Sequence, residues 1–200
     1  MDLAVIAVTF GAIFLVELPD KTFIATLVLS TRYRPWAVWI GVGTAFLIQT
    51  LIATTIGQAV TYLPDEVVKG VAAAIFLAGA VLLFREAPKA DAGEAETEQE
   101  YAGKAKEGLN PWKAMGASFL VLFAAEWGDL SQLLTISLVG RYHEPVSVFA
   151  GAWTALLLVS GLAVVAGRLL LRHVKLSWIH YVGAAVCLAL CVLTVVELLR

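Results

Sequence analysis

The sequence predicts an all-α integral membrane protein with six transmembrane helices, and three observations lead to this fold class. Of the 200 residues, 60% are hydrophobic and 15% are charged, and the mean hydropathy is +0.84. A soluble domain carries about 25% charged residues, so this chain could not cover its own surface in water. The other two observations are a series of long apolar segments and an internal duplication. The composition makes the lipid bilayer the expected surroundings of the chain, and the net charge of −2 argues against nucleic acid as a partner.

Six segments are long enough to cross a bilayer, which takes about 20 mostly apolar residues. Three meet this length clearly, near residues 36–61, 145–167 and 176–196, and a fourth, near residues 67–84, is short but adequate once its flanks are included. The other two, near residues 3–29 and 114–139, are apolar except for one group of acidic residues in each. We therefore expect six spans.

The basic residues predict the orientation. With six spans, one side of the membrane receives the 30–35 loop, the 85–113 segment and the 168–175 loop, which together hold most of the Lys and Arg residues. Cytoplasmic loops carry an excess of Lys and Arg, so this side is expected to be the cytoplasm and both termini are expected to be non-cytoplasmic. A bacterial inner membrane or plasma membrane is the expected location.

An internal duplication divides the chain into two similar halves. The motif ELPDKT at residues 17–22 recurs as EWGDLS at residues 126–131, and further matches follow at nearly the same offset. Each half holds three spans, and an odd number makes the second half enter the membrane from the opposite side. Residues 1–84 and 114–200 are therefore expected to form two inverted three-helix repeats, an arrangement common in secondary transporters with a midplane site.

The halves are joined by a charged cytoplasmic linker at residues 85–113. It is rich in Ala, Gly and Glu and nearly free of large apolar side chains. Such a composition buries little apolar surface, so we expect a flexible or partly helical tether.

Each half places two carboxylates near the middle of the membrane. At about 1.5 Å per residue, Glu17 lies about 21 Å and Glu126 about 18 Å along its span. Asp20 and Asp129 follow three residues later, which puts each pair on one helix face. An ionised carboxylate at a helix centre costs about 2.5–3.5 kcal/mol, so four cost roughly 10 kcal/mol without compensation. A structural ion pair with Lys21 could explain one such pair alone, but two matched pairs indicate a functional site.

The acids and their polar neighbours predict a divalent-cation site. With Lys21 offsetting one charge, the four carboxylates leave −3, and a divalent ion reduces this to −1. Protons and cations would therefore compete for the same oxygens. All-oxygen ligation suits Ca²⁺ and Mn²⁺, and no His or Cys accompanies the acids. The further oxygen donors expected near the acids are Thr22, Ser131 and Gln132, with Gln49 and Thr50 either as ligands or as hydrogen-bonding contacts between helices. Pro19 and Gly128 are expected to interrupt the two helices and to free backbone carbonyls.

The paired motif resembles the Gdt-type cation/proton antiporters, which include Golgi and chloroplast Ca²⁺/Mn²⁺ transporters and bacterial manganese exporters. Those proteins have six spans and carry Glu-x-Gly-Asp-(Lys/Arg)-(Thr/Ser) twice. The resemblance implies that Glu17, Asp20, Glu126 and Asp129 form the cation site, with Thr22 and Ser131 assisting. Two residues depart from the pattern: Pro19 stands for the usual Gly, and Leu130 for the usual Lys or Arg.

Together these features predict a secondary antiporter, and not an enzyme, that exports Mn²⁺ or Ca²⁺ from the cytoplasm in exchange for protons. No cofactor is expected besides the transported ions. An intramembrane aspartyl protease, a passive cation channel and an exporter of small organic solutes remain as alternatives. The oligomeric state stays open, a homo-oligomer included.

Overall fold

The fold is all-helical throughout the part of the chain that the computed structural model describes, residues 1–18, 20–105, 108–173 and 175–199. Proline opens α3, α5 and α7, where its missing N–H is not needed. The side chains of Asp2 and Asn110 cap α1 and α5 by accepting backbone N–H groups. The helices are α1 (Leu3–Glu17), α2 (Lys21–Arg32), α3 (Pro35–Val60), α4 (Asp65–Lys104), α5 (Pro111–Ala125), α6 (Leu130–Tyr142), α7 (Pro145–His173) and α8 (Leu176–Leu198).

Four of these helices are long and apolar enough to cross a membrane by themselves, namely α3, the first part of α4, α7 to residue 166, and α8. Two further spans arise if each bent pair of short helices counts as one. The axes of α1 and α2 meet at 70°, and those of α5 and α6 at 68°. The chain is therefore a multi-pass membrane protein with four to six spans, and each of the two acid-containing segments is a broken helix.

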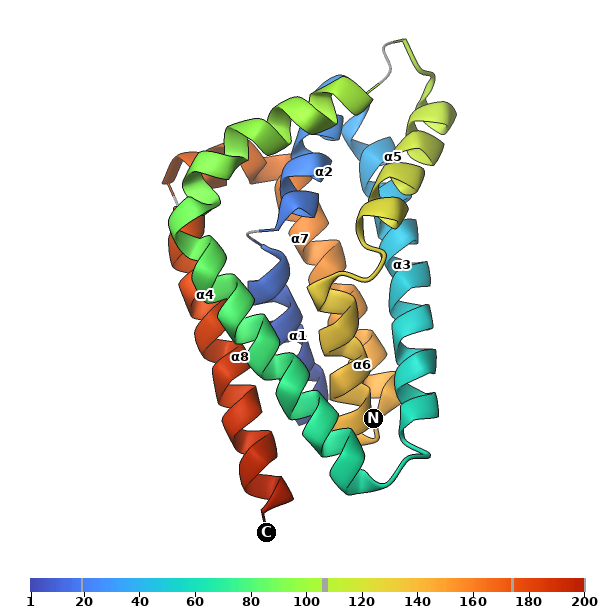
Figure 1. The fold of residues 1–200 in the computed structure, drawn as a ribbon. Coiled ribbons are helices and arrows are strands. Elements are labelled where there is room, and N and C mark those ends of the chain that lie inside the picture. The colour runs from blue at the N-terminus through green and yellow to red at the C-terminus, as the bar shows by residue number, and fades with distance from the viewer. Residues whose placement is uncertain (19, 106–107, 174, 200) are drawn as a thin grey trace.

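The helices form one bundle in which the two breaks lie inside (Figure 1). Both termini lie at one end of the bundle, and the connection between α4 and α5 lies at the opposite end. The α2–α3 and α7–α8 connections also lie at the α4–α5 end. The loops in which the sequence concentrates its basic residues therefore share one end of the molecule.

The segment expected to be a tether is largely helical. α4 continues without interruption through Pro88 to Lys104, and beyond the membrane span it lies across the end of the bundle next to α2 (Figure 1). Ala, Glu, Gln and Lys are strong helix formers, which explains the continuation. Lys104 donates a hydrogen bond to Glu100 at 2.5 Å and thereby lowers the pKa of that carboxyl. Tyr101 is buried against the bundle, and this burial raises its pKa to about 12. Tyr101 thereby packs the end of α4 against the bundle, within a segment whose composition predicted a flexible or partly helical tether.

Two glycines allow the closest helix crossings. Gly41 of α3 lies against the backbone of α5, where an added Cβ would overlap the carbonyl oxygen of Met115. Gly151 of α7 lies against α1, where an added Cβ would be 2.6 Å from the carbonyl oxygen of Ile6. Both broken helices are thus packed by their first segments onto a long continuous helix, and small residues are what permit such contacts in membranes.

We expect Gly41→Ala and Gly151→Ala to destabilise the bundle by about 1–3 kcal/mol each, because the added methyl group meets backbone that cannot move aside. Thermal unfolding of the purified protein in detergent measures the effect. Gly11→Ala is the matched control, since an added Cβ at Gly11 meets nothing within 4 Å. Equal melting temperatures for all three variants would contradict the crossing geometry.

Candidate cation-binding site

Each acidic pair brackets a break in a helix. Glu17 ends α1 and Asp20 precedes α2, while Glu126 follows α5 and Asp129 precedes α6. The backbone N–H of Asp20 donates to the carbonyl of Glu17 at 3.1 Å, and that of Asp129 to the carbonyl of Glu126 at 3.2 Å. The same backbone hydrogen bond therefore joins the two acids at each break.

Gly128 makes the second break possible. Its φ is +77°, a left-handed conformation that side-chain-bearing residues rarely adopt. The expected role of Gly128 is thus supported by its backbone. Pro19, its counterpart at the first break, lies outside the described residues.

Three carboxylates from the two breaks come together. Glu17, Asp20 and Glu126 each offer an oxygen within 4.8 Å of the other two. Ligand oxygens on opposite sides of Ca²⁺ are about 4.6–5.2 Å apart, given bonds of about 2.3–2.6 Å, so one ion could contact all three carboxylates. The chain places Glu17 and Glu126, 109 positions apart in sequence, in one potential coordination sphere.

The two glutamates are almost completely buried. The exposed fraction is 0% for Glu17 and 2% for Glu126. One oxygen of each, Oε2 of Glu17 and Oε1 of Glu126, has no hydrogen-bond partner among the described residues. Buried carboxylate oxygens need a proton, a donor or a cation, so these two atoms are available for a ligand.

Thr22 and Ser131 each hold the glutamate of their own break. The Thr22 hydroxyl donates to Oε1 of Glu17 at 2.6 Å, and the Ser131 hydroxyl donates to Oε2 of Glu126 at 3.3 Å. Both hydroxyls come from the first turn of the following helix. They leave the other oxygen of each glutamate free, which orients the carboxylates toward one another.

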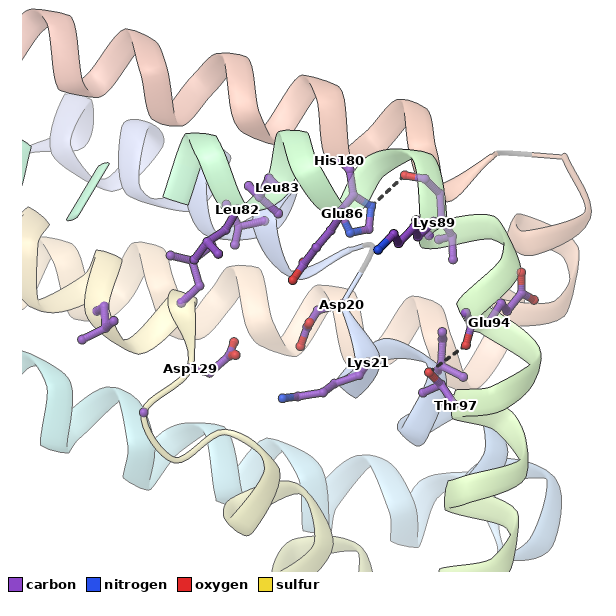
Figure 2. Close-up of a pocket in the computed structure, with 18 residues that line it drawn as sticks. Asp20, Lys21, Leu82, Leu83, Glu86, Lys89, Glu94, Thr97, Asp129 and His180 are labelled. Atoms are coloured by element: carbon purple, nitrogen blue, oxygen red, sulfur yellow. Dashed lines mark hydrogen bonds between the residues drawn. The ribbon is translucent and has the colours of Figure 1, made fainter. Parts of the chain in front are cut away.

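The fourth acid, Asp129, lies beside this group rather than in it. Asp129 and Asp20 both line a cavity of about 520 Å³ between α2, α4, α6 and α8. Figure 2 shows the side chains of Asp20, Asp129 and Lys21 directed into this space. Lys21 thus places its ammonium in the same cavity as the two aspartates, as its expected charge-offsetting role requires.

The remaining expected donors lie on the other side of Glu126. Gln49, Thr50 and Gln132 line a small cavity of about 10 Å³ together with Glu126 and Ser131. The Thr50 hydroxyl donates to the Phe46 carbonyl at 2.7 Å. The two glutamine amides are hydrogen-bonded to each other and to the backbone, and no carboxylate oxygen is among their partners in these bonds.

The large cavity also contains residues that the sequence did not single out. Glu86 and Lys89 of α4 line it, together with His180 of α8, and Figure 2 shows Glu86 directed toward Asp20. In the sequence, Glu86 and Lys89 fall in the 85–113 linker and His180 falls in the last apolar segment, so none of them is next to the acids. The only signal in the sequence is that Glu86 and Lys89 lie at the end of the apolar segment of α4. That they face the same cavity as the acids depends on how α4 packs against α2 and α6.

Comparison with known proteins identifies the family of the chain. The sequence model of one family, described as divalent cation/proton antiporter GDT1, matches residues 5–91 and 114–200, two segments that start 109 positions apart and contain one acidic pair each. No solved structure matches the chain.

Relatives of this family align over most of the chain. GDT1-like protein sll0615 of Synechocystis is 31% identical over 84% of this chain and 84% of its own length. Protein PAM71-homolog of Arabidopsis thaliana, a chloroplastic protein, is 30% identical over 90% of this chain, and the chain spans 55% of that relative. The activity of the family is transport and not enzymatic catalysis, which removes the protease alternative. The chain belongs to the GDT1 family of divalent cation/proton antiporters.

Proposed function

We propose that this chain exports Mn²⁺ or Ca²⁺ from the cytoplasm in exchange for protons, through a site formed by Glu17, Asp20 and Glu126, with Asp129 beside it. The observation that carries this proposal is the convergence of three carboxylates, two of them buried, within 4.8 Å of one another. Three carboxylates this close together form a site that suits a single divalent cation.

The chemistry of exchange follows from the two glutamate oxygens that have no hydrogen-bond partner in the described part of the chain. Each can be occupied by a proton or by a ligand bond to the cation, but not by both. Binding the cation therefore releases protons, and binding protons releases the cation. Four acids and Lys21 give −3 when all are ionised, so the site needs compensating positive charge in either state.

Thr22 and Ser131 assist by orienting the glutamates. Their hydroxyl bonds keep one oxygen of each carboxylate occupied and turn the other toward the site. Outer partners of this kind commonly tune the affinity of a metal site.

We further propose that residues 1–84 and 114–200 are inverted repeats joined by the 85–113 segment. Each half contains a broken pair followed by two long helices. Equivalent contacts recur: Phe10 stacks on Phe14 at 5.7 Å and Phe119 on Phe123 at 5.4 Å, each pair in the first segment of a broken helix. The glycine crossings of α3 and α7 correspond in the same way.

The orientation we propose places the α4–α5 connection in the cytoplasm and both termini outside, in a bacterial plasma membrane. The basic loops that lie at this end support it. The large cavity extends from Asp20 and Asp129 to Glu94 and Thr97 at the same end, so the acids would be reached from the cytoplasm in this conformation.

At the opposite end of the bundle, a buried arginine connects α6 to α8. Arg141 of α6 donates to the carbonyl of Leu190 at 3.0 Å, to the hydroxyl of Thr194, and to Glu197 at 2.9 Å, all on α8. These bonds tie α6 to α8 on the non-cytoplasmic side. We propose that these bonds keep this end closed while the large cavity gives access from the other end, as alternating access requires.

Neutralising the acids tests the proposal. We expect Glu17→Gln, Asp20→Asn and Glu126→Gln each to abolish proton-driven cation movement, because each removes an anionic ligand from a three-carboxylate site. Purified protein in proteoliposomes with an imposed pH gradient allows Mn²⁺, Ca²⁺ and lumenal pH to be followed together. Glu66→Gln, at an exposed position in the first turn of α4, is the control that should retain exchange.

Normal exchange in all three neutral variants would refute the site. Cation movement that only runs downhill and ignores the pH gradient would indicate a channel. Competition by an organic solute would indicate an exporter of that solute class.

The two hydroxyls should differ in importance. We expect Thr22→Val to raise the KM for the cation roughly tenfold, because a hydrogen bond to a charged group contributes about 1.5–3 kcal/mol. Ser131→Ala should raise it less, since its bond to Glu126 is longer. The same flux assay measures both, with Thr44→Val as control because the Thr44 hydroxyl bonds only to its own helix at Ile40. A larger effect of Ser131→Ala would contradict the assigned geometry.

A further inference from the structure

The second helix break leaves backbone groups that need partners. α5 ends at Ala125, and the N–H of Glu126 donates to the carbonyl of Leu122. The next carbonyl, that of Phe123, accepts a hydrogen bond from Nε2 of Gln49 at 2.9 Å. On the far side of Glu126, the N–H of Gly128 donates to Oε1 of Gln132 at 2.9 Å. Two side-chain amides thus satisfy the backbone on both sides of this glutamate.

The two amides are joined into one chain of hydrogen bonds. Nε2 of Gln132 donates to Oε1 of Gln49 at 2.8 Å, so the chain runs from Gly128 through Gln132 and Gln49 to Phe123. We call these two glutamines the amide clamp. Gln49 stands in the middle of α3, a continuous helix, so the clamp fastens the second break to a fixed element.

The direction of the chain is fixed by its ends. The Phe123 carbonyl can only accept and the Gly128 N–H can only donate, so each amide has one orientation that satisfies all three bonds. Both amide oxygens are therefore engaged, one by Gln132 and the other by Gly128. A carboxylate at position 49 would face a carbonyl oxygen, and one at position 132 would lose the donor to Gln49.

The first break is built differently. The residues at the positions corresponding to Gln132 and Gln49 are Phe23 and Val159, which have no polar side-chain atoms. The carbonyl of Phe14, which corresponds to Phe123, accepts the backbone N–H of Leu18 at 3.0 Å. Among the described residues, α1 thus continues by its own backbone where α5 depends on side chains of other helices.

We propose that Gln49 and Gln132 are positioning residues that hold Glu126 rigidly and thereby set the site's discrimination between divalent cations of different size. This inference deepens the proposed function and depends on it. Discrimination between such ions depends on cavity size, ligand number and flexibility. The amide clamp fastens the second break to α3 but does not touch the first break. Glu126 is therefore the more rigid of the two glutamates, and its fixed position limits the size of cation that fits.

Equilibrium binding of Mn²⁺ and of Ca²⁺ to the purified protein tests the clamp. We expect Gln49→Leu to weaken binding of the preferred ion about 10- to 100-fold, the usual effect of losing an outer partner of a metal site. Binding of the other ion should weaken less, so the ratio of the two affinities moves toward one. Gln58→Leu, an exposed position on the same helix, is the matched control.

Glutamate substitutions separate positioning from ligation. If Gln132 were a ligand, Gln132→Glu would preserve or tighten cation binding, because a carboxylate is the stronger oxygen donor. If the two glutamines act as a clamp, Gln132→Glu and Gln49→Glu should both weaken cation binding. Both should also move the ratio of the Mn²⁺ and Ca²⁺ affinities toward one. Tighter binding in Gln132→Glu would overturn the positioning role.

Hydrogen–deuterium exchange of residues 123–130 gives a readout that does not depend on transport. We expect faster exchange in Gln49→Leu and unchanged exchange in Gln58→Leu. An unchanged Mn²⁺/Ca²⁺ ratio in a folded Gln49→Leu protein would overturn the proposal, whatever its exchange rate. If wild-type protein binds neither ion, the proposed function fails at its first step. If it binds them and the clamp variants do so equally well, only the clamp fails.

Discussion

The burial of carboxylates inside a bundle of largely apolar helices is the constraint on which the rest of this structure depends. Glu17 and Glu126 are almost without solvent exposure, and each retains one oxygen with no hydrogen-bond partner among the residues that the structure describes. Lipid hydrocarbon provides neither hydrogen bonds nor compensating charge for a carboxylate oxygen. These oxygens are therefore stable only where protons, cations or polar groups can reach them. The fold therefore has to supply a polar interior, a path to it, and helices able to place charged groups away from lipid.

The broken helices meet that requirement. Because α1 and α5 end inside the bundle, their acids are buried and backbone groups are left that a continuous helix would pair internally. These groups then need partners of their own. At the second break the partners are side chains of α3 and α6, whereas at the first break a further backbone bond closes α1. Two similar halves thus arrive at unequal surroundings for their acids.

Close packing of continuous helices supports the breaks from outside. Gly41 and Gly151 let α3 and α7 approach the first segments of the broken pairs closely. α4 and α8 line the remaining side, and the docked end of α4 lines the cavity that holds Lys21 and the aspartates. A segment that looked like a tether is in this way part of the wall that surrounds the site.

The sequence by itself determined the membrane class, the apolar segments, the acidic pairs and the family, because these follow from composition, spacing and motif. Thr22 and Ser131 were also predictable, since they adjoin the acids in the chain. Tertiary structure decided what depends on contacts between distant helices: that Glu17, Asp20 and Glu126 can share one ion while Asp129 stands beside them, that Glu86 and His180 face the same cavity, and that Gln49 and Gln132 bond to each other. The distance between two side chains that are far apart in the sequence is set by how their helices pack. The hydrophobic pattern of a helix shows which face is buried but not which helix that face contacts.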